Sequence, residues 1–169
     1  MNRLVMIVSL CLCAILQAIL PPWLAMGQAK APLLLAGVVY YALTRGTRQM
    51  AEAALLGGIL QDSLGPIPLG FSVLAFLGVA VLVNQFQERI FAESVLTHVI
   101  AGMAAPVLVS MCLYVLLVSG GYRAGVPFSF VMSKALGMSI LGMGAFPMVF
   151  LLIRGLDDRL GVRVARRVA

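Results

Sequence analysis

Charged residues are scarce in this chain of 169 residues, and acidic residues are scarcer than basic ones. Asp, Glu, Lys and Arg make up 11% of the sequence, against roughly 25% in an ordinary soluble domain. Hydrophobic residues make up 62%. Four uncharged runs are long enough to cross a hydrocarbon layer of roughly 30 Å as a helix, and they cover residues 4–29, 63–87, 94–122 and 135–153. The composition excludes a freestanding water-soluble enzyme and predicts an all-α integral membrane protein.

Residues that carry chemistry are also few. The chain has one histidine, His98, and three cysteines that all lie inside apolar runs, so neither a metal site nor a disulfide framework is expected. It has no Gly-x-Ser-x-Gly motif and no phosphate-binding loop. His98 is expected to form a hydrogen bond between helices. We therefore predict that the protein is not an enzyme and has no cofactor.

Six membrane-spanning helices are predicted between the charged residues, within one domain covering 1–155. Their approximate bounds are 4–22, 31–45, 49–63, 68–85, 95–118 and 135–153. The second and third are short, which leaves open whether they cross the bilayer fully. We interpret them as two short spans because a re-entrant pair would place Arg45 and Arg48 inside the bilayer, at several kcal/mol each.

The first segment has two interpretations. Pro21 and Pro22 are expected to end its helix near Leu20. The alternative is a cleavable signal peptide, because a positively charged start precedes an apolar run and Gly27-Gln28-Ala29 resembles a cleavage site.

The positive charges favour one orientation. With the amino terminus in the cytoplasm, nine Lys and Arg residues lie inside and three outside, as the positive-inside rule requires. The inside set is Arg3, Arg45, Arg48, Arg89, Arg154, Arg159, Arg163, Arg166 and Arg167, and the outside set is Lys30, Arg123 and Lys134. Both termini are therefore predicted to be cytoplasmic. Because the arginines lie at segment ends rather than on one face, nucleic-acid binding is not expected.

Two segments are predicted to lie along the membrane surface. Residues 119–134 are expected to form the longest outer loop. The basic tail at 156–169 spaces Leu156, Leu160 and Val164 four residues apart, with Asp157 among the polar residues elsewhere on the wheel. This pattern indicates an amphipathic helix on the inner leaflet or a frayed basic anchor.

Two acidic residues are predicted inside membrane segments, where an acid is a functional candidate by default. Glu52 lies four residues after Arg48, which favours an ion pair at a helix start. Asp62 precedes a run of turn-forming residues, so it either caps the following turn or has a function of its own.

Small residues form flat helix faces at four-residue spacing. Ala53 and Gly57, and Ala54 and Gly58, give the third segment such a face. Further pairs are Ala14 and Ala18 in the first segment and Ala101 and Ala105 in the fifth. These small-residue pairs have two possible roles, which are packing inside the protein and docking of a partner helix. Pro106 and Pro147 are expected to kink the last two helices.

The stretch from Ala31 to Phe91 resembles a known family. Its order is Pro32-Leu33-Leu34-Leu35, then Val38-Val39-Tyr40-Tyr41-Ala42-Leu43, a basic turn, Gly57-Gly58-Ile59-Leu60-Gln61-Asp62, and Pro68-Leu69-Gly70. These motifs, with Pro147 and Phe150-Leu151-Leu152-Ile153-Arg154 near the end, are similar to MreD, the bacterial rod-shape-determining membrane protein family. The resemblance draws attention to candidate partner-binding or structural residues: Tyr40, Tyr41, Ala54, Gly57, Gly58, Asp62, Gly65, Pro68, Gly70 and Pro147.

The resemblance implies a scaffold of the cell-elongation machinery in the bacterial inner membrane. It implies MreC, a bitopic membrane protein, as partner, with links to MreB filaments and to the RodA glycosyltransferase and its transpeptidase. It also implies a fold similar to the substrate-binding subunits of energy-coupling-factor transporters. The alternative is a small-molecule or lipid-binding subunit of a transporter, which needs an outer pocket with converging polar groups. The outer polar residues are Gln28, Lys30, Asp62, Ser63, Tyr122 and Arg123.

Overall fold

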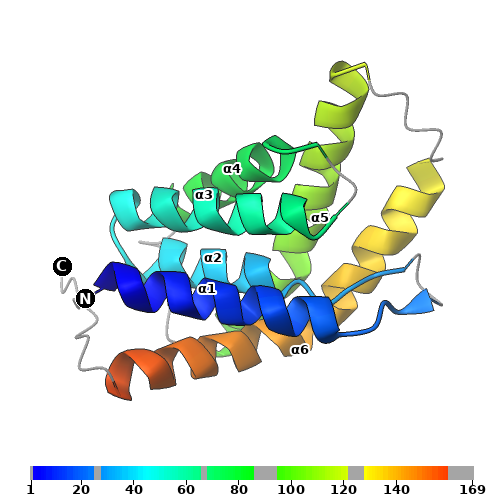
Figure 1. Cartoon of the computed structure of the whole chain (residues 1–169). Helices are drawn as coiled ribbons and strands as arrows, with labels where there is room; N and C mark the ends of the chain where they lie inside the picture. The colour runs from blue at the N-terminus through cyan, green and yellow to red at the C-terminus, as the bar shows by residue number, and fades with distance from the viewer. Residues whose placement is uncertain (1, 25–27, 66–67, 86–94, 122–127, 160–169) are drawn as a thin grey trace.

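The computed structural model describes residues 2–24, 28–65, 68–85, 95–121 and 128–159, and these ranges contain six helices (Figure 1). The helices are α1 Asn2–Ile19, α2 Leu33–Thr44, α3 Thr47–Ser63, α4 Phe71–Gln85, α5 Val95–Ser119 and α6 Phe128–Arg159. The prediction of an all-α chain with six helices is confirmed for this part of the chain. The start of α1 and the end of α6 lie on the same side of the bundle (Figure 1).

Helix α2 is the centre of the bundle. Every residue from Leu33 to Leu43 is buried, and α2 contacts each of the other five helices. A helix that is apolar all round, with no polar stripe, packs stably only when other elements cover all its faces. The uniform hydrophobicity of this short segment thus explains its central position.

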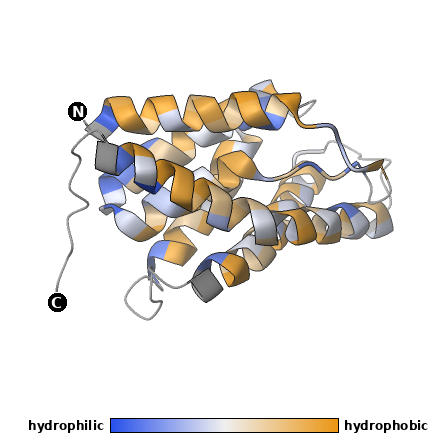
Figure 2. Cartoon of the chain, turned by 90° about the horizontal axis from the view of Figure 1, so that it is seen from below, coloured by the Kyte–Doolittle hydropathy of each residue, from blue (hydrophilic) through white to orange (hydrophobic). Residues whose placement is uncertain are grey.

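Hydrophobic residues run along the outer helices (Figure 2), and many of their side chains are exposed. Leu4 and Ile19 of α1 are 69% and 73% exposed, and Leu151 of α6 is 72% exposed. Two helical stretches, His98–Ser119 and Ser129–Asp157, are long and apolar enough to cross a membrane, and α1, α2 and α4 contain shorter apolar stretches. Continuous exposed apolar surface of this kind is typical of a surface that faces lipid.

The end of α1 and the turn between α2 and α3 lie close to the positions predicted from the sequence. Helix α1 ends at Ile19, just before Pro21 and Pro22, as the prolines predict. The basic turn between α2 and α3 consists of Arg45 and Gly46, because α3 already begins at Thr47.

Helix α6 is longer at both ends than the predicted span of 135–153. It begins at Phe128, so the segment expected as an outer loop up to Lys134 is helical from Phe128 onward. It also continues to Arg159, so the first residues of the expected separate tail extend the same helix; residues 160–169 lie outside the described part. Pro147 lies within this helix, which changes direction along its length (Figure 1).

Helices α5 and α6 cross with their backbones in close contact. A Cβ added to Gly142 would overlap the carbonyl oxygen of Gly102, and the converse also holds. Beside this crossing, the Ser139 hydroxyl is 2.9 Å from the Met103 carbonyl oxygen of α5 and 2.9 Å from the Ala135 carbonyl oxygen of its own helix. Small residues that allow such an approach are a usual feature of helix pairs in membranes.

We expect Gly142→Ala to destabilise the protein and Gly144→Ala not to. The methyl group at Gly142 forces the two helices apart, and overpacking of this kind costs about 1–3 kcal/mol. At Gly144 an added Cβ meets nothing within 4 Å, and alanine is the better helix former by roughly 0.5–1 kcal/mol. Thermal unfolding of both variants in one detergent measures the difference, and equal midpoints would contradict the close crossing.

Candidate functional site

The turn between α3 and α4 is held by Asp62. This residue is 3% exposed, and its carboxylate accepts hydrogen bonds from the Gly70 amide at 2.7 Å and the Ser72 amide at 3.2 Å. These amides belong to the start of α4, where backbone N–H groups have no partner within the helix. The prediction that Asp62 caps the following turn is confirmed.

Gly65, Pro68 and Gly70 shape the same turn. The Gly65 amide donates to the Asp62 carbonyl oxygen, and the Pro68 carbonyl accepts from the Phe71 amide. Gly70 has φ +104°, a conformation that residues with a side chain rarely adopt. The candidate residues of this segment therefore have structural roles.

The small-residue face of α3 packs inside the bundle. A Cβ added to Gly58 would overlap the backbone of Val73 in α4, and one added to Gly57 would lie 2.6 Å from Val38 Cγ2 in α2. Ala53 and Ala54 are completely buried. This face is occupied by helices of the same chain, so internal packing is its role rather than the docking of a partner helix.

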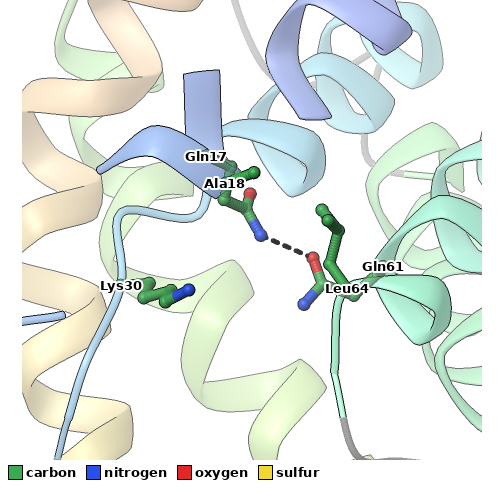
Figure 3. A pocket seen from close by; sticks show the side chains of 5 residues that line it. All are labelled: Gln17, Ala18, Lys30, Gln61 and Leu64. Carbon is green, nitrogen blue, oxygen red and sulfur yellow. Dashed lines mark hydrogen bonds between the residues drawn. The ribbon is translucent and has the colours of Figure 1, made fainter. Parts of the chain in front are cut away.

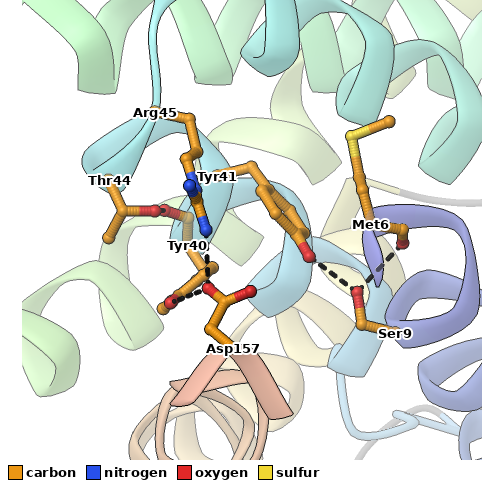
Figure 4. A network of polar contacts seen from close by, with 7 residues as sticks. All are labelled: Met6, Ser9, Tyr40, Tyr41, Thr44, Arg45 and Asp157. Carbon is orange, nitrogen blue, oxygen red and sulfur yellow. Dashed lines mark hydrogen bonds and ion pairs between the residues drawn. The ribbon is translucent and has the colours of Figure 1, made fainter. Parts of the chain in front are cut away.

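Tyr40 lies near the carboxyl end of α2 and belongs to a buried ionic network (Figure 4). Its hydroxyl donates to Asp157 Oδ2 at 2.9 Å, and the same oxygen is 2.8 Å from Arg45 Nη2. The side chains of Arg45 and Asp157 are 7% and 1% exposed. The network ties the end of α2 to the last turns of α6.

Tyr41 extends the polar contacts to α1. Its hydroxyl lies 2.8 Å from the Ser9 hydroxyl, which bonds in turn to the Met6 carbonyl oxygen at 2.9 Å (Figure 4). Because Ser9 has one hydroxyl hydrogen and uses it on Met6, Tyr41 is the donor of the first bond. Both tyrosines predicted as candidates thus connect α2 to neighbouring helices.

Aromatic rings pack beside the ionic network. Tyr40 meets Tyr41 and Phe150 edge-on, with ring centroids 5.3 and 5.1 Å apart. The ring of His98, expected only as a residue between helices, lies 4.0 Å from that of Phe150. These rings surround the polar groups with apolar surface, which strengthens electrostatic interactions between them.

The placement of Asp157 corrects the sequence analysis. Asp157 was assigned to the polar face of a surface helix and Arg45 to an exposed turn, but both are buried and paired. One signal was available: Phe146, Phe150, Ile153 and Asp157 repeat at the spacing of one helix face, and all four are buried. The run of charges around Asp157 concealed this pattern.

The ion pair is not fully satisfied by the part of the chain that the structure describes. Arg45 Nε and Asp157 Oδ1 are buried and have no hydrogen-bond partner among these residues. Removing charges from water costs several kcal/mol per ion, and only good geometry compensates for it. Such a pair is a means of holding α2, α3 and α6 in one arrangement.

The remaining predicted residues lie apart from this network. Glu52 pairs with Arg48 at 3.5 Å, as predicted, and with Arg3 at 2.8 Å. Lys30 lines a cavity at the opposite end of the bundle, whereas Tyr122 and Arg123 lie outside the described residues. Within the described ranges no three His, Cys, Asp or Glu side chains are grouped to hold a metal ion.

Comparison with protein families identifies a match over most of the chain. The model of the family described as rod shape-determining protein MreD matches residues 1–156 of the chain. Comparison with curated proteins and with solved structures gives no significant match.

We expect Asp157→Ala to destabilise the protein strongly. The substitution leaves the Arg45 guanidinium buried without its counter-ion, and the loss of one partner of a buried pair costs about 3–5 kcal/mol. The double variant Arg45→Met with Asp157→Leu should recover most of this loss, because it removes both charges. Thermal unfolding in detergent measures both effects.

Glu52→Gln is the matched control for this experiment. It breaks an ion pair whose arginine is 61% exposed, and exposed pairs contribute about 0–1 kcal/mol. A loss as large as that of Asp157→Ala would show that burial is not what gives the Arg45–Asp157 pair its importance.

Asp62→Ala should weaken the start of α4. Two backbone amides lose their acceptor, and removal of a helix cap costs about 0.5–2 kcal/mol. Asp62→Asn, which keeps one acceptor oxygen, should lose less. Ser63→Ala, at the exposed neighbouring position, serves as control, with an expected change within about 0.5 kcal/mol. An unfolding midpoint for Asp62→Ala equal to that of the control would refute the capping role.

Proposed function

This chain belongs to the MreD family of rod shape-determining membrane proteins, and on that premise we propose that it is a nonenzymatic scaffold of the cell-elongation complex. It partners MreC in the inner membrane and helps to couple MreB filaments to peptidoglycan synthesis by RodA and its transpeptidase. The observation that carries the proposal is the family match, which extends over residues 1–156.

The buried polar side chains hold helices together, and this role supports the proposal of a scaffold. Asp62 caps α4, Asp157 holds Arg45 and Tyr40, and Gln17 binds the backbone at the start of α2. In each case the polar group fixes one helix relative to another. A rigid helical platform is what a scaffold needs in order to hold its partners in a defined geometry.

We place six spans in the membrane, with both termini in the cytoplasm. The positions of the charges support this orientation. Arg3 lies at the start of α1, and Arg45 and Arg48 lie where α2 ends and α3 starts, on the same side of the bundle. Lys30, before α2, and Lys134, near the start of α6, lie toward the opposite side. This distribution agrees with the positive-inside rule.

The partner helix of MreC would contact lipid-facing side chains. Gly57, Gly58, Gly102 and Gly142 already face other helices of this chain. The open surfaces present Leu, Ile and Met side chains instead. Association between helices in lipid rests on shape and on polar contacts, because lipid gives no hydrophobic drive between them.

A small-molecule or lipid-binding transporter subunit is the second candidate. The observation that favours it is the cavity lined by Gln17, Lys30 and Gln61. Its volume of about 220 Å³ is below the range of roughly 300–1,000 Å³ that is usual for sites enclosing a whole small molecule. We therefore favour the scaffold over the transporter subunit as the function of this chain.

Gentle extraction of the tagged chain from its native host, followed by mass spectrometry, tests the proposal. We expect MreC to be recovered, together with RodA and its transpeptidase, and an unrelated tagged inner-membrane protein at the same level is the control. Recovery of a transport module, or of a small molecule at stoichiometric amounts, would contradict the scaffold. Gly58→Leu is not a suitable variant here, since its side chain would overlap the Val73 backbone.

A further inference from the structure

The cavity at the end of the bundle opposite the start of α1 has a built polar lining. It lies where α1 and α3 end and the segment before α2 passes, and it has a volume of about 220 Å³. Its lining residues are Gln17, Ala18, Lys30, Gln61 and Leu64 (Figure 3). Three of these five side chains, those of Gln17, Lys30 and Gln61, are polar.

The orientation of the Gln17 amide is fixed by the backbone of α2. The Leu34 amide, in the first turn of this helix, donates to Gln17 Oε1 at 3.0 Å. A backbone N–H group can only donate, so the oxygen of Gln17 must face α2 and its nitrogen must face away. Gln17 is 4% exposed, which leaves it no alternative partner in water.

The orientation of Gln61 follows from that of Gln17. Gln17 Nε2 donates to Gln61 Oε1 at 2.8 Å, so the oxygen of Gln61 is occupied as an acceptor. Its nitrogen therefore points into the cavity, and so does the ammonium group of Lys30 (Figure 3). Both polar groups that reach the open space are hydrogen-bond donors, and one carries a positive charge.

The neighbouring carboxylate of Asp62 does not line the cavity. Asp62 follows Gln61 in α3, and its two oxygens accept the amides of Gly70 and Ser72 at the start of α4. Among the described residues of this end of the bundle, the other charged side chain is the exposed Lys134 of α6. The side chains that line the cavity thus include an ammonium group and an amide N–H₂ group but no carboxylate, and this combination is complementary to an anion that carries several acceptor oxygens.

From this geometry we propose that the cavity binds a phosphate group. Lys30 supplies the charge, and the Gln61 amide supplies directed hydrogen bonds. The volume admits a headgroup rather than a whole lipid. The phosphate comes from an anionic phospholipid or from free phosphate, and the surroundings favour the lipid.

The surroundings of the cavity are those of a membrane interface. Leu64 in the lining is 43% exposed, and Trp23 and Leu24 of the loop after α1 are 45% and 76% exposed. The Trp23 amide donates to the Ala29 carbonyl oxygen at 2.7 Å, which holds this loop beside Lys30. Tryptophan is enriched at the level of lipid headgroups, so acyl chains have apolar surface to lie on next to the cavity.

Native mass spectrometry of the purified full chain tests the site directly. The probe is dioleoylphosphatidylglycerol, and the control ligand is dioleoylglycerol, which has the same chains without phosphate. We expect the phospholipid to bind at least about tenfold more tightly, because a charge-assisted hydrogen bond is involved. Equal binding of the two lipids would overturn the proposal. This test does not rest on the scaffold function, since no protein partner is present.

Three variants connect the binding to the cavity. Gln61→Glu keeps the acceptor for Gln17 but replaces the donor that faces the cavity with a charged acceptor, and Lys30→Met removes the cation. Each should weaken phospholipid binding about tenfold, whereas Lys134→Met, the control at the same end of the bundle, should leave it unchanged within about twofold. Wild-type affinity in Gln61→Glu would show that the phosphate binds elsewhere.

Inorganic phosphate distinguishes the two sources. If millimolar phosphate displaces the phospholipid from the wild-type chain, and the displacement is lost in Lys30→Met, free phosphate is the ligand of the cavity. If the phospholipid remains bound, its headgroup is the ligand. Lys30 belongs to a loop rather than to a helix, so this variant should keep the unfolding midpoint of the wild type and separate binding from folding.

Discussion

The structure depends on the burial of a helix that is shorter than the hydrocarbon layer is thick. Helix α2 has 12 residues, about 18 Å at 1.5 Å per residue, whereas the hydrocarbon layer is roughly 30 Å thick. All the residues from Leu33 to Leu43 are buried among the other helices. A backbone polar group left unsatisfied in lipid costs several kcal/mol. The buried backbone groups at the ends of α2 therefore need partners from the protein itself.

Both ends of α2 meet this requirement with side chains from other helices or from its own last turn. At the start, Pro32 provides no side-chain cap, and Gln17 of α1 accepts the Leu34 amide instead. At the end, the Thr44 hydroxyl donates to the Tyr40 carbonyl oxygen, and the Arg45 amide donates to the Tyr41 carbonyl oxygen. Gln17, which lines the cavity, and Arg45, which belongs to the ion pair, thus each bind the backbone at one end of this short helix.

Features that depend on residues close together in the sequence were predictable from local sequence patterns. The prolines after Leu20 mark the end of α1, and the turn formers after Asp62 indicate its capping role. The Arg45–Asp157 pair was not predictable in this way, because its members are 112 positions apart and each lies in a segment rich in charge. The Gly102–Gly142 crossing was missed for a similar reason: small residues are frequent in apolar helices, and only their approach in space distinguishes these two.

The same packing determines how the protein can recognise other molecules. Gly57, Gly58, Gly102 and Gly142 are used in packing between its own helices, and its large exposed apolar side chains are mostly Leu, Ile, Val and Met. Such side chains gain little by leaving lipid for another apolar helix, so specificity must come from shape and from polar groups. Accessible polar groups are found at the helix ends, where Arg3 and Arg48 flank Glu52 and Lys30 and Gln61 line the cavity. Recognition by a scaffold of this construction therefore depends on the two ends of the bundle, while its apolar sides set how closely a partner helix can approach.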